Sequence, residues 1–91
     1  MVKLVFTETY TVRATKFIRK HQEIIGQYKK ALELLELNPY HPSLRLHKLK
    51  GRLSELHSVS INISYRIILE LILVDNQIIL VDIGTHDAIY R

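Results

Sequence analysis

The apolar residues of this chain change their spacing at Asn38-Pro39, and this change limits what the chain can fold into. Before this point they recur every three or four residues, which is the spacing of one side of an α-helix. Between His57 and Ile63, apolar and polar side chains alternate, which is the spacing of a β-strand with one buried face. The sequence therefore predicts helices in its first half and a sheet in its second half.

Two amphipathic helices are predicted after a short strand over Lys3–Phe6. Either Thr7 or Thr9 can cap the first helix through its hydroxyl group, and that helix extends over residues 9–20. The second helix ends before Pro39, because proline disfavours helical backbone at the preceding residue. The apolar sides of the two helices consist of Tyr10, Ala14, Phe17, Ile18 and His21, and of Ile24, Ile25, Tyr28, Ala31, Leu32 and Leu35.

The rest of the chain predicts a meander of three strands. Residues 39–54 form a turn-rich connection that contains a short strand, and longer strands follow over residues 57–63, 65–74 and 77–83. Strands this close in sequence pair antiparallel. The two helices must cover one face of the sheet, and we expect the other face to be open. The predicted fold is α+β, with two N-terminal helices packed on one face of a small, mainly antiparallel, curved sheet.

Length and composition narrow the possible classes of protein. With 91 residues, the chain has room for one domain over residues 1–91. It contains no cysteine, which excludes disulfides and thiolate metal sites. The N-terminal apolar run is too short for a signal peptide, and Glu70 interrupts the longest apolar stretch well below the length of a membrane span. We therefore expect a soluble, cytoplasmic protein that binds no membrane.

A basic segment lies in the connection between the helices and the sheet. Residues 38–53 contain no carboxylate and four cations, namely Arg45, Lys48, Lys50 and Arg52. A local excess of this kind favours a polyanion such as RNA, or an acidic protein partner. These side chains are candidate phosphate contacts, which position RNA without reading its sequence. A basic loop exposed to solvent would have the same composition, so the segment alone does not decide the function.

Three passages of the sequence resemble the RelE/ParE superfamily of toxins from toxin–antitoxin systems. Residues 38–51 look like the connection that these toxins place before their central sheet. Residues 56–68 look like their two core strands, with Tyr65-Arg66 near the start of the second strand. Residues 84–90 are similar to the end of the YafQ-like branch, in which a histidine and a terminal aromatic residue lie in the active site. The resemblance covers essentially the whole chain.

The resemblance implies an endonuclease that cuts mRNA held in the ribosomal A site and that a cognate antitoxin inhibits. Arg66 matches the arginine that contacts the reacting phosphate. His86 matches a C-terminal general acid or base, and His47 matches a histidine that this branch carries before its glycine. Tyr90 matches the terminal aromatic residue, which would stack on an RNA base or instead anchor the chain end to the core.

The match is incomplete on the first core strand. RelE has two lysines where this chain has Ser58 and Ser60, and the aspartates of the YafQ-like branch are missing around Ser58 and Ser64. These differences leave two other functions open. One is a ParE-like toxin that binds DNA gyrase, and the other is an inactive relative that binds only RNA or an antitoxin.

The chemistry of RNA cleavage without a metal ion fits the matched residue types. The reaction needs a base for the 2′-hydroxyl proton, a cation for the phosphorane charge and an acid for the leaving oxygen. Imidazole titrates near neutral pH and can take either proton role, which suits His86 and His47. Guanidinium binds phosphate through two N–H groups, which suits Arg66. The structural alternatives are an Arg66–Glu70 pair and an exposed terminal position for His86.

The spacing of the histidines indicates no metal site. The sequences H-x-x-x-H and H-E-x-x-H are absent, so we expect no metal ion and no cofactor. His57 falls on the apolar face of its strand, which predicts a core histidine whose ring nitrogens are hydrogen-bonded. His41 lies between two prolines and is expected in a loop.

Overall fold

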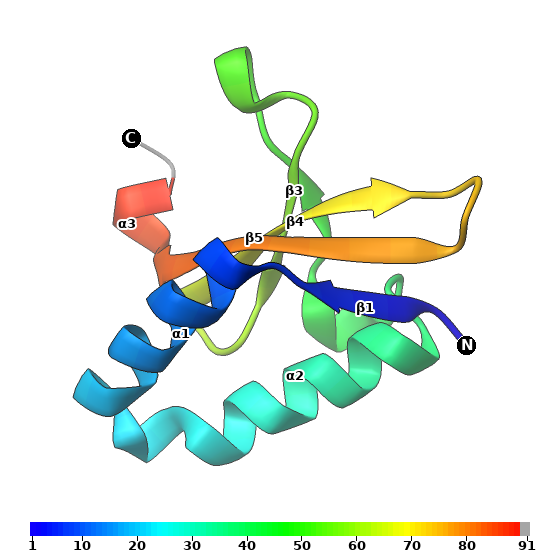
Figure 1. Cartoon of the computed structure of the whole chain (residues 1–91). Helices are drawn as coiled ribbons and strands as arrows, with labels where there is room; N and C mark the ends of the chain where they lie inside the picture. The colour runs from blue at the N-terminus through cyan, green and yellow to red at the C-terminus, as the bar shows by residue number, and fades with distance from the viewer. Residues whose placement is uncertain (90–91) are drawn as a thin grey trace.

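The structure, a computed structural model, describes residues 1–89 of the chain, except for the side chains of Arg52, His86 and Ile89. Within this part, one sheet has the strand order β1-β5-β4-β3-β2 (Figure 1). The strands are β1 (Lys3–Phe6), β2 (His47–Lys48), β3 (His57–Ser60), β4 (Tyr65–Ile72) and β5 (Gln77–Thr85). The helices are α1 (Glu8–Lys20), α2 (Ile25–Leu37) and α3 (His86–Ile89). Short 3₁₀ turns in the connections are η1 (Gln22–Ile24), η2 (Pro42–Leu44) and η3 (Gly51–Leu53).

The ends of the two long helices follow from local residues. Thr7 caps α1, because its Oγ1 accepts a hydrogen bond from the backbone N–H of Tyr10 at 3.1 Å. The same hydroxyl donates to the carbonyl of Leu80 in β5 at 3.2 Å, so the cap also ties the helix to the sheet. Thr7, rather than Thr9, is therefore the capping residue. α2 ends at Leu37, just before the proline that predicted its end. No described helix has the length and apolar character needed to cross a membrane.

The sheet combines the predicted meander with one parallel pair. β2, β3, β4 and β5 pair in sequence order, each antiparallel to the next, which confirms the meander. The short strand expected inside the connection is β2. β1 pairs with β5 in parallel register, with Leu4 opposite Ile78 and Phe6 opposite Leu80. The first and last strands therefore lie side by side in a mixed, mainly antiparallel sheet.

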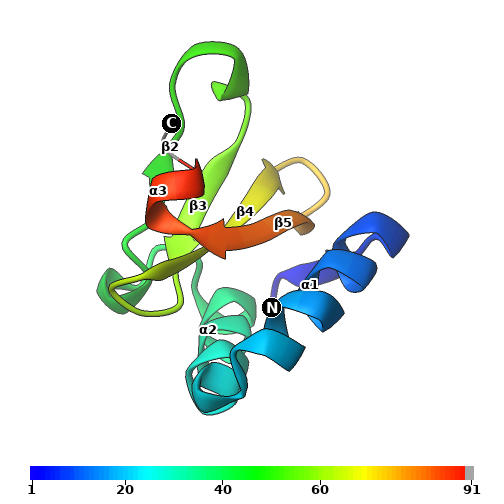
Figure 2. The same cartoon turned by 90° about the vertical axis from the view of Figure 1, so that its left-hand side faces the viewer.

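α1 and α2 cover one face of the sheet and enclose the main core (Figure 2). The hydroxyl groups of Tyr10 and Tyr28, one from each helix, form a hydrogen bond of 2.6 Å, and burial raises the pKa of Tyr10. The helical sides predicted from the apolar spacing are thus the sides that meet the sheet. The buried core residues are Tyr10, Ala14, Ile24, Ala31, Leu35, Leu44, Val59, Ile61, Ile67, Leu69, Ile78, Leu80 and Ile83.

The opposite face of the sheet is partly covered, whereas the sequence predicted it to be open. A smaller apolar cluster covers part of it, formed by Leu49 and Ile68 with Leu53, Leu56 and Val81 packed against them. Three of these residues belong to the connection between β2 and β3, which therefore folds back over the sheet. The basic connection is therefore not only a solvent-exposed loop, because its leucines pack against the sheet.

Two positions of the alternating stretch also differ from the prediction. Ser58, expected on a wet face, is 0% exposed, because the second face of β3 is covered as well. Ile63, expected on the buried face, is 90% exposed. The reason is that β3 ends at Ser60 and the chain then turns toward β4.

We expect Leu35→Ala to lower the free energy of unfolding by about 2–5 kcal/mol, because this fully buried side chain fills the space between α2 and the sheet. Leu37→Ala is the matched control on the same helix, since Leu37 is 69% exposed, and it should change stability by less than about 0.5 kcal/mol. Urea unfolding followed by circular dichroism measures both values. Equal losses in the two variants would contradict the orientation of α2.

Candidate active site

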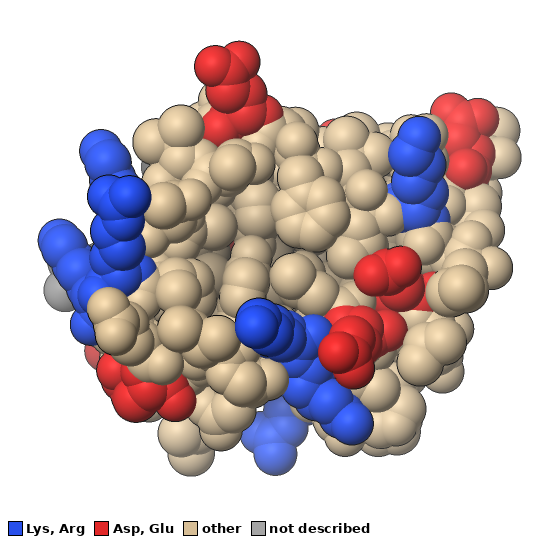
Figure 3. Space-filling model, turned by 60° about the horizontal axis from the view of Figure 1, so that its bottom comes forward, with Lys and Arg blue, Asp and Glu red and all other residues tan. Residues whose placement is uncertain are grey.

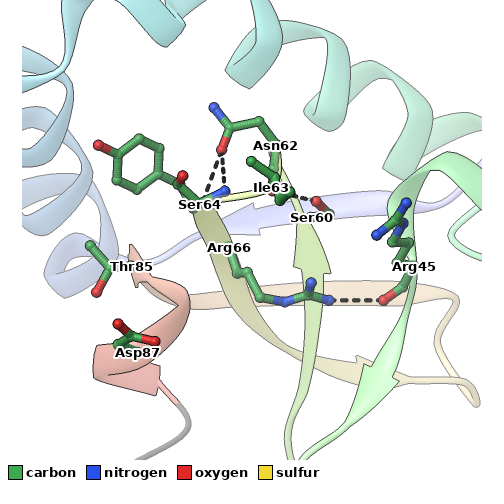
Figure 4. Close-up of a pocket in the computed structure, with 9 residues that line it drawn as sticks. Arg45, Ser60, Asn62, Ile63, Ser64, Arg66, Thr85 and Asp87 are labelled. Atoms are coloured by element: carbon green, nitrogen blue, oxygen red, sulfur yellow. Dashed lines mark hydrogen bonds between the residues drawn. The ribbon is translucent and has the colours of Figure 1, made fainter.

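A cavity of about 580 Å³ opens where the β3–β4 turn, the start of β4 and the end of β5 meet (Figure 4). Its lining is polar and includes two guanidinium groups and one carboxylate. The segments that form it are far apart in the sequence, so only the folded chain brings them together. The described lining residues are Arg45, Ser60, Asn62, Ile63, Ser64, Tyr65, Arg66, Thr85 and Asp87. We call this the main cavity.

Arg66 is held in the main cavity by hydrogen bonds to two different segments. Its side chain extends from β4, and the residue is only 8% exposed. Its Nε donates to Oγ of Ser58 at 2.9 Å, and its Nη2 donates to the backbone carbonyl of Arg45 at 2.9 Å. These bonds orient the guanidinium group. Glu70, the partner considered from the sequence, is not among these acceptors.

Arg45 contributes both its backbone and its side chain to the main cavity. Its backbone has φ 49° and ψ 51°, a left-handed conformation that costs a residue with a Cβ about 1–2 kcal/mol. In this conformation the carbonyl accepts the hydrogen bond from Arg66, while the side chain lines the cavity (Figure 4). Backbone strain of this kind persists where the surroundings hold it, and such positions cluster at functional sites.

The β3–β4 turn forms one wall of the main cavity. Oδ1 of Asn62 accepts hydrogen bonds from the backbone N–H groups of Ser64 at 2.8 Å and Tyr65 at 3.0 Å. Nδ2 of Asn62 donates to Oε1 of Gln27 in α2 at 3.0 Å. One side chain therefore closes the turn and also ties it to the helix, which fixes the position of this wall.

An aromatic cluster supports the wall at Tyr65. The rings of Tyr65 and Phe17 meet edge to face, with centroids 5.1 Å apart. The Tyr65 hydroxyl lies 3.2 Å from Nδ1 of His21, and the same nitrogen lies 3.7 Å from the carboxylate of Glu23. The end of α1 thereby holds the residue that directly precedes Arg66.

The end of β5 and α3 form the side of the main cavity that faces Arg45 (Figure 4). Oγ1 of Thr85 accepts a hydrogen bond from the backbone N–H of Ala88 at 3.1 Å, which caps this short helix. Thr85 and Asp87 both line the cavity. His86 lies between them in the chain, so its backbone is at the cavity rim, while its side chain is outside the described part.

Of the predicted site residues, the structure brings Arg45 and Arg66 into one cavity. It places three others on or near β2. His47 and Lys48 form this edge strand and are exposed, and the exposed Lys50 follows. His47 pairs with Ser58, the residue that binds the Arg66 side chain. The side chain of Arg52 and the whole of Tyr90 lie outside the described residues.

Of two histidines outside the main cavity, His41 lies where the sequence predicted it and His57 matches its prediction only in part. His41 is in a loop, and its Nδ1 accepts the backbone N–H of Ser43 at 3.1 Å. His57 is partly buried on β3, but its Nδ1 is buried without a hydrogen-bond partner in the described part, so the expected partner is missing. Burial lowers the pKa of His57, and the nearby Lys48 and His47 lower it further. No group of three His, Asp or Glu residues among those described could hold a metal ion.

The charge on the helical side of the molecule is mixed. Figure 3 shows basic and acidic side chains interspersed around a mostly uncharged middle area. The net charge of +4 is therefore not gathered on this side.

The prediction from sequence missed the polar side chains that the β3–β4 turn, the end of β5 and α3 contribute to the main cavity. Asn62, Ser64, Thr85 and Asp87 line the main cavity but were not among the predicted site residues. A signal existed for Asn62, since asparagine in a turn often binds the backbone through its side chain. No local pattern places this turn beside the end of β5, because the pairing of β4 with β5 decides it.

Comparison with solved structures shows that the chain has the fold of YafQ and YoeB/ParE-type toxins. YafQ from E. coli strain BL21(DE3) superposes with a TM-score of 0.77 at 16% identity, over 100% of both chains. A YoeB/ParE toxin from Agrobacterium tumefaciens gives 0.72 at 15% identity, over 93% of this chain and 99% of that chain. A chain of the E. coli DinJ–YafQ toxin–antitoxin complex gives 0.75 at 18% identity, over 99% and 98%. No protein-family model and no curated protein sequence matches the chain.

We expect Ser58→Ala to lower the free energy of unfolding by about 1–3 kcal/mol, because it removes the oxygen that accepts the hydrogen bond of the buried Arg66 Nε. Ser64→Ala is the matched control, since Ser64 is exposed and uses its backbone N–H, not its hydroxyl, to bind Asn62. Chemical denaturation of both variants tests this. Unchanged stability of Ser58→Ala would show that Arg66 does not depend on this hydroxyl.

We expect the stability of the fold to decrease as the pH falls below about 6.5, the ordinary pKa of histidine, because the pKa of His57 is lower in the folded state. The unfolded chain then binds a proton that the folded chain does not, so acid favours unfolding until the folded pKa is reached. His57→Gln should remove this part of the pH dependence, and His41→Gln should retain it. The measurement is the urea midpoint of each protein from neutral to mildly acidic pH, and parallel curves for wild type and His57→Gln would contradict it.

Proposed function

We propose that this protein is the toxin of a type II toxin–antitoxin pair and an endoribonuclease that cuts mRNA without a metal ion. The observation that carries this proposal is the Arg66 guanidinium, oriented by Ser58 and Arg45 inside a polar cavity. The fold shared with YafQ and with a YoeB/ParE toxin supports the toxin role. The resemblance of residues 84–90 to the YafQ-like branch supports the nuclease role.

Arg66 supplies the positive charge that RNA cleavage requires. The phosphorus atom gains negative charge on its oxygens as the 2′-oxygen attacks, and a guanidinium already held in place stabilises that charge without reorganisation. The Arg45 side chain lines the same cavity and provides a second cation for the phosphate. The basic residues that follow contact phosphates further along the strand, namely Lys48, Lys50 and Arg52.

Two proton transfers complete the proposed reaction. A base takes the proton of the 2′-hydroxyl, the 2′-oxygen bonds to the adjacent phosphorus, and an acid gives a proton to the 5′-oxygen that leaves. The products are a 2′,3′-cyclic phosphate, or a 3′-phosphate after hydrolysis, and a 5′-hydroxyl end. His86 and His47 take the two proton roles, because imidazole is the side chain that can both accept and donate a proton in such a reaction. Tyr90 stacks on an RNA base.

The partners that follow from this proposal are mRNA, in the ribosomal A site, and a cognate antitoxin, both in the cytoplasm. The structural neighbours include toxin–antitoxin complexes, namely DinJ–YafQ from E. coli and YoeB–YefM from Staphylococcus aureus. An antitoxin with acidic side chains would neutralise the basic connection and block the approach of RNA. This gives inhibition an electrostatic basis in Arg45, Lys48 and Lys50.

We expect induced expression of the wild type in a bacterial host to arrest growth and to create new mRNA ends, detected by primer extension. His86→Ala and Arg66→Ala should abolish both effects at unchanged protein level. With purified protein, His86→Ala should slow RNA cleavage by about a hundred- to ten-thousandfold, which is the usual contribution of a placed acid or base. The matched controls are His41→Ala and Arg13→Ala, since His41 lies in a loop and Arg13 forms a surface ion pair with Asp82.

The other outcomes separate the competing functions. Growth arrest without new RNA ends would contradict the nuclease and favour the ParE-like toxin that binds DNA gyrase, in which His86→Ala keeps its toxicity. No arrest by the wild type would favour an inactive relative that only binds RNA or an antitoxin.

A further inference from the structure

A second groove lies beside the main cavity, between α2 and the chain that enters β2. It has a volume of about 270 Å³, and its described lining includes Gln27, Lys30, Ala31, Ser43, Leu44 and Ile61. We call it the α2 groove.

The α2 groove and the main cavity share a wall at the end of β3. Ser60 lines both of them. Its Oγ donates a hydrogen bond to the carbonyl of Asn62 at 2.7 Å, and the Asn62 amide binds Gln27, which lines the groove. Figure 4 shows Ser60 and Asn62 on the side of the main cavity toward α2. The two hollows therefore adjoin at Ser60.

The α2 groove combines an apolar floor with a polar rim. Ala31, Leu44 and Ile61 in its lining are buried, whereas the half-buried Leu34 and the exposed Gly26 present apolar surface that can meet the flat face of a nucleobase. Gln27 and Lys30 on the rim are exposed. An amide can bind the edge of a base, and an ammonium group can bind a phosphate.

We propose that the α2 groove holds the nucleotide next to the reacting phosphate of a single-stranded RNA substrate. This inference rests on the proposed function, since it extends the same site by one nucleotide. The polar rim and the continuity with the arginine-lined cavity favour RNA over an apolar protein segment. Lys30 binds the phosphate of this nucleotide, and Gln27 faces the edge of its base.

Two variants test the groove in different ways. Lys30→Ala removes the rim cation. Gly26→Leu fills the groove with a side chain, and a Cβ at Gly26 would meet no other heavy atom within 4 Å, so the backbone of α2 is undisturbed. Lys29→Ala is the matched control, since Lys29 is the preceding exposed lysine on α2 and does not line the described part of the groove.

The experiment measures binding of 2′-O-methyl RNA, which cannot be cleaved, by fluorescence anisotropy with the full-length protein. Oligonucleotides of two to six nucleotides are compared. We expect wild type and Lys29→Ala to gain about five- to a hundredfold in affinity when the nucleotide that fills the groove is added. Lys30→Ala and Gly26→Leu should lose this gain and bind the dinucleotide as wild type does.

Two results would overturn the inference. One is an unchanged gain in both variants, which would leave the groove as a surface for a protein segment. The other is equal weakening at every length, which would mean a general loss of charge or of fold. Cleavage of unmodified RNA by the wild type is measured in parallel. Length-dependent binding through the groove without any cleavage would retain the groove as an RNA site and contradict the proposed nuclease activity. Failure of the groove inference can therefore be distinguished from failure of the proposed function.

Discussion

β4 is buried on both faces over residues 66–69, and the rest of the structure depends on covering it. Successive side chains point to opposite faces, so Ile67 and Leu69 lie in the main core while Ile68 lies in the smaller cluster on the other side. The two long helices cover the first face. On the second face, the connection between β2 and β3 folds back and covers part of the sheet with Leu49, Leu53 and Leu56. A basic segment is thereby brought over the sheet as a consequence of packing.

The same burial explains how Arg66 is positioned. A cation on the covered face needs acceptors, because burying an unsatisfied charge is costly. Ser58 on the neighbouring strand and the carbonyl of Arg45 supply them. The bond to Arg45 in turn uses a left-handed backbone that an unsupported residue would leave. The hydrogen bonds that stabilise this part of the fold are therefore the ones that orient the candidate phosphate-binding group, and stability and activity are expected to respond together to changes at Ser58.

The elements of the fold could be predicted where the spacing of apolar residues indicates which side chains are buried. α1 and α2 carry such a period over a long segment, whereas β4 and β5 were predicted from the turns at residues 62–64 and 75–76 that bound them. Ser58 and Ile63 were assigned to the wrong environments, because alternation assumes a continuing strand with one covered face, and β3 stops early and is covered on both. In the candidate site, Arg66 was found because an arginine inside an apolar strand is a local signal. The cavity around it was not, because the β3–β4 turn, the end of β5 and α3 meet only through strand pairing.

The burial of Ser58 bears on the difference from RelE that the sequence resemblance indicated at Ser58 and Ser60. A lysine at position 58 would have to place an ammonium group where the side chain is now 0% exposed and bonded to Arg66. Such a group would repel the guanidinium at short range, which disfavours a cation at this position beside a buried Arg66. The cations nearest to the main cavity come instead from the connection, with Arg45 in its lining. Ser60, where the resemblance sets the second lysine, is uncharged and lines both the main cavity and the α2 groove.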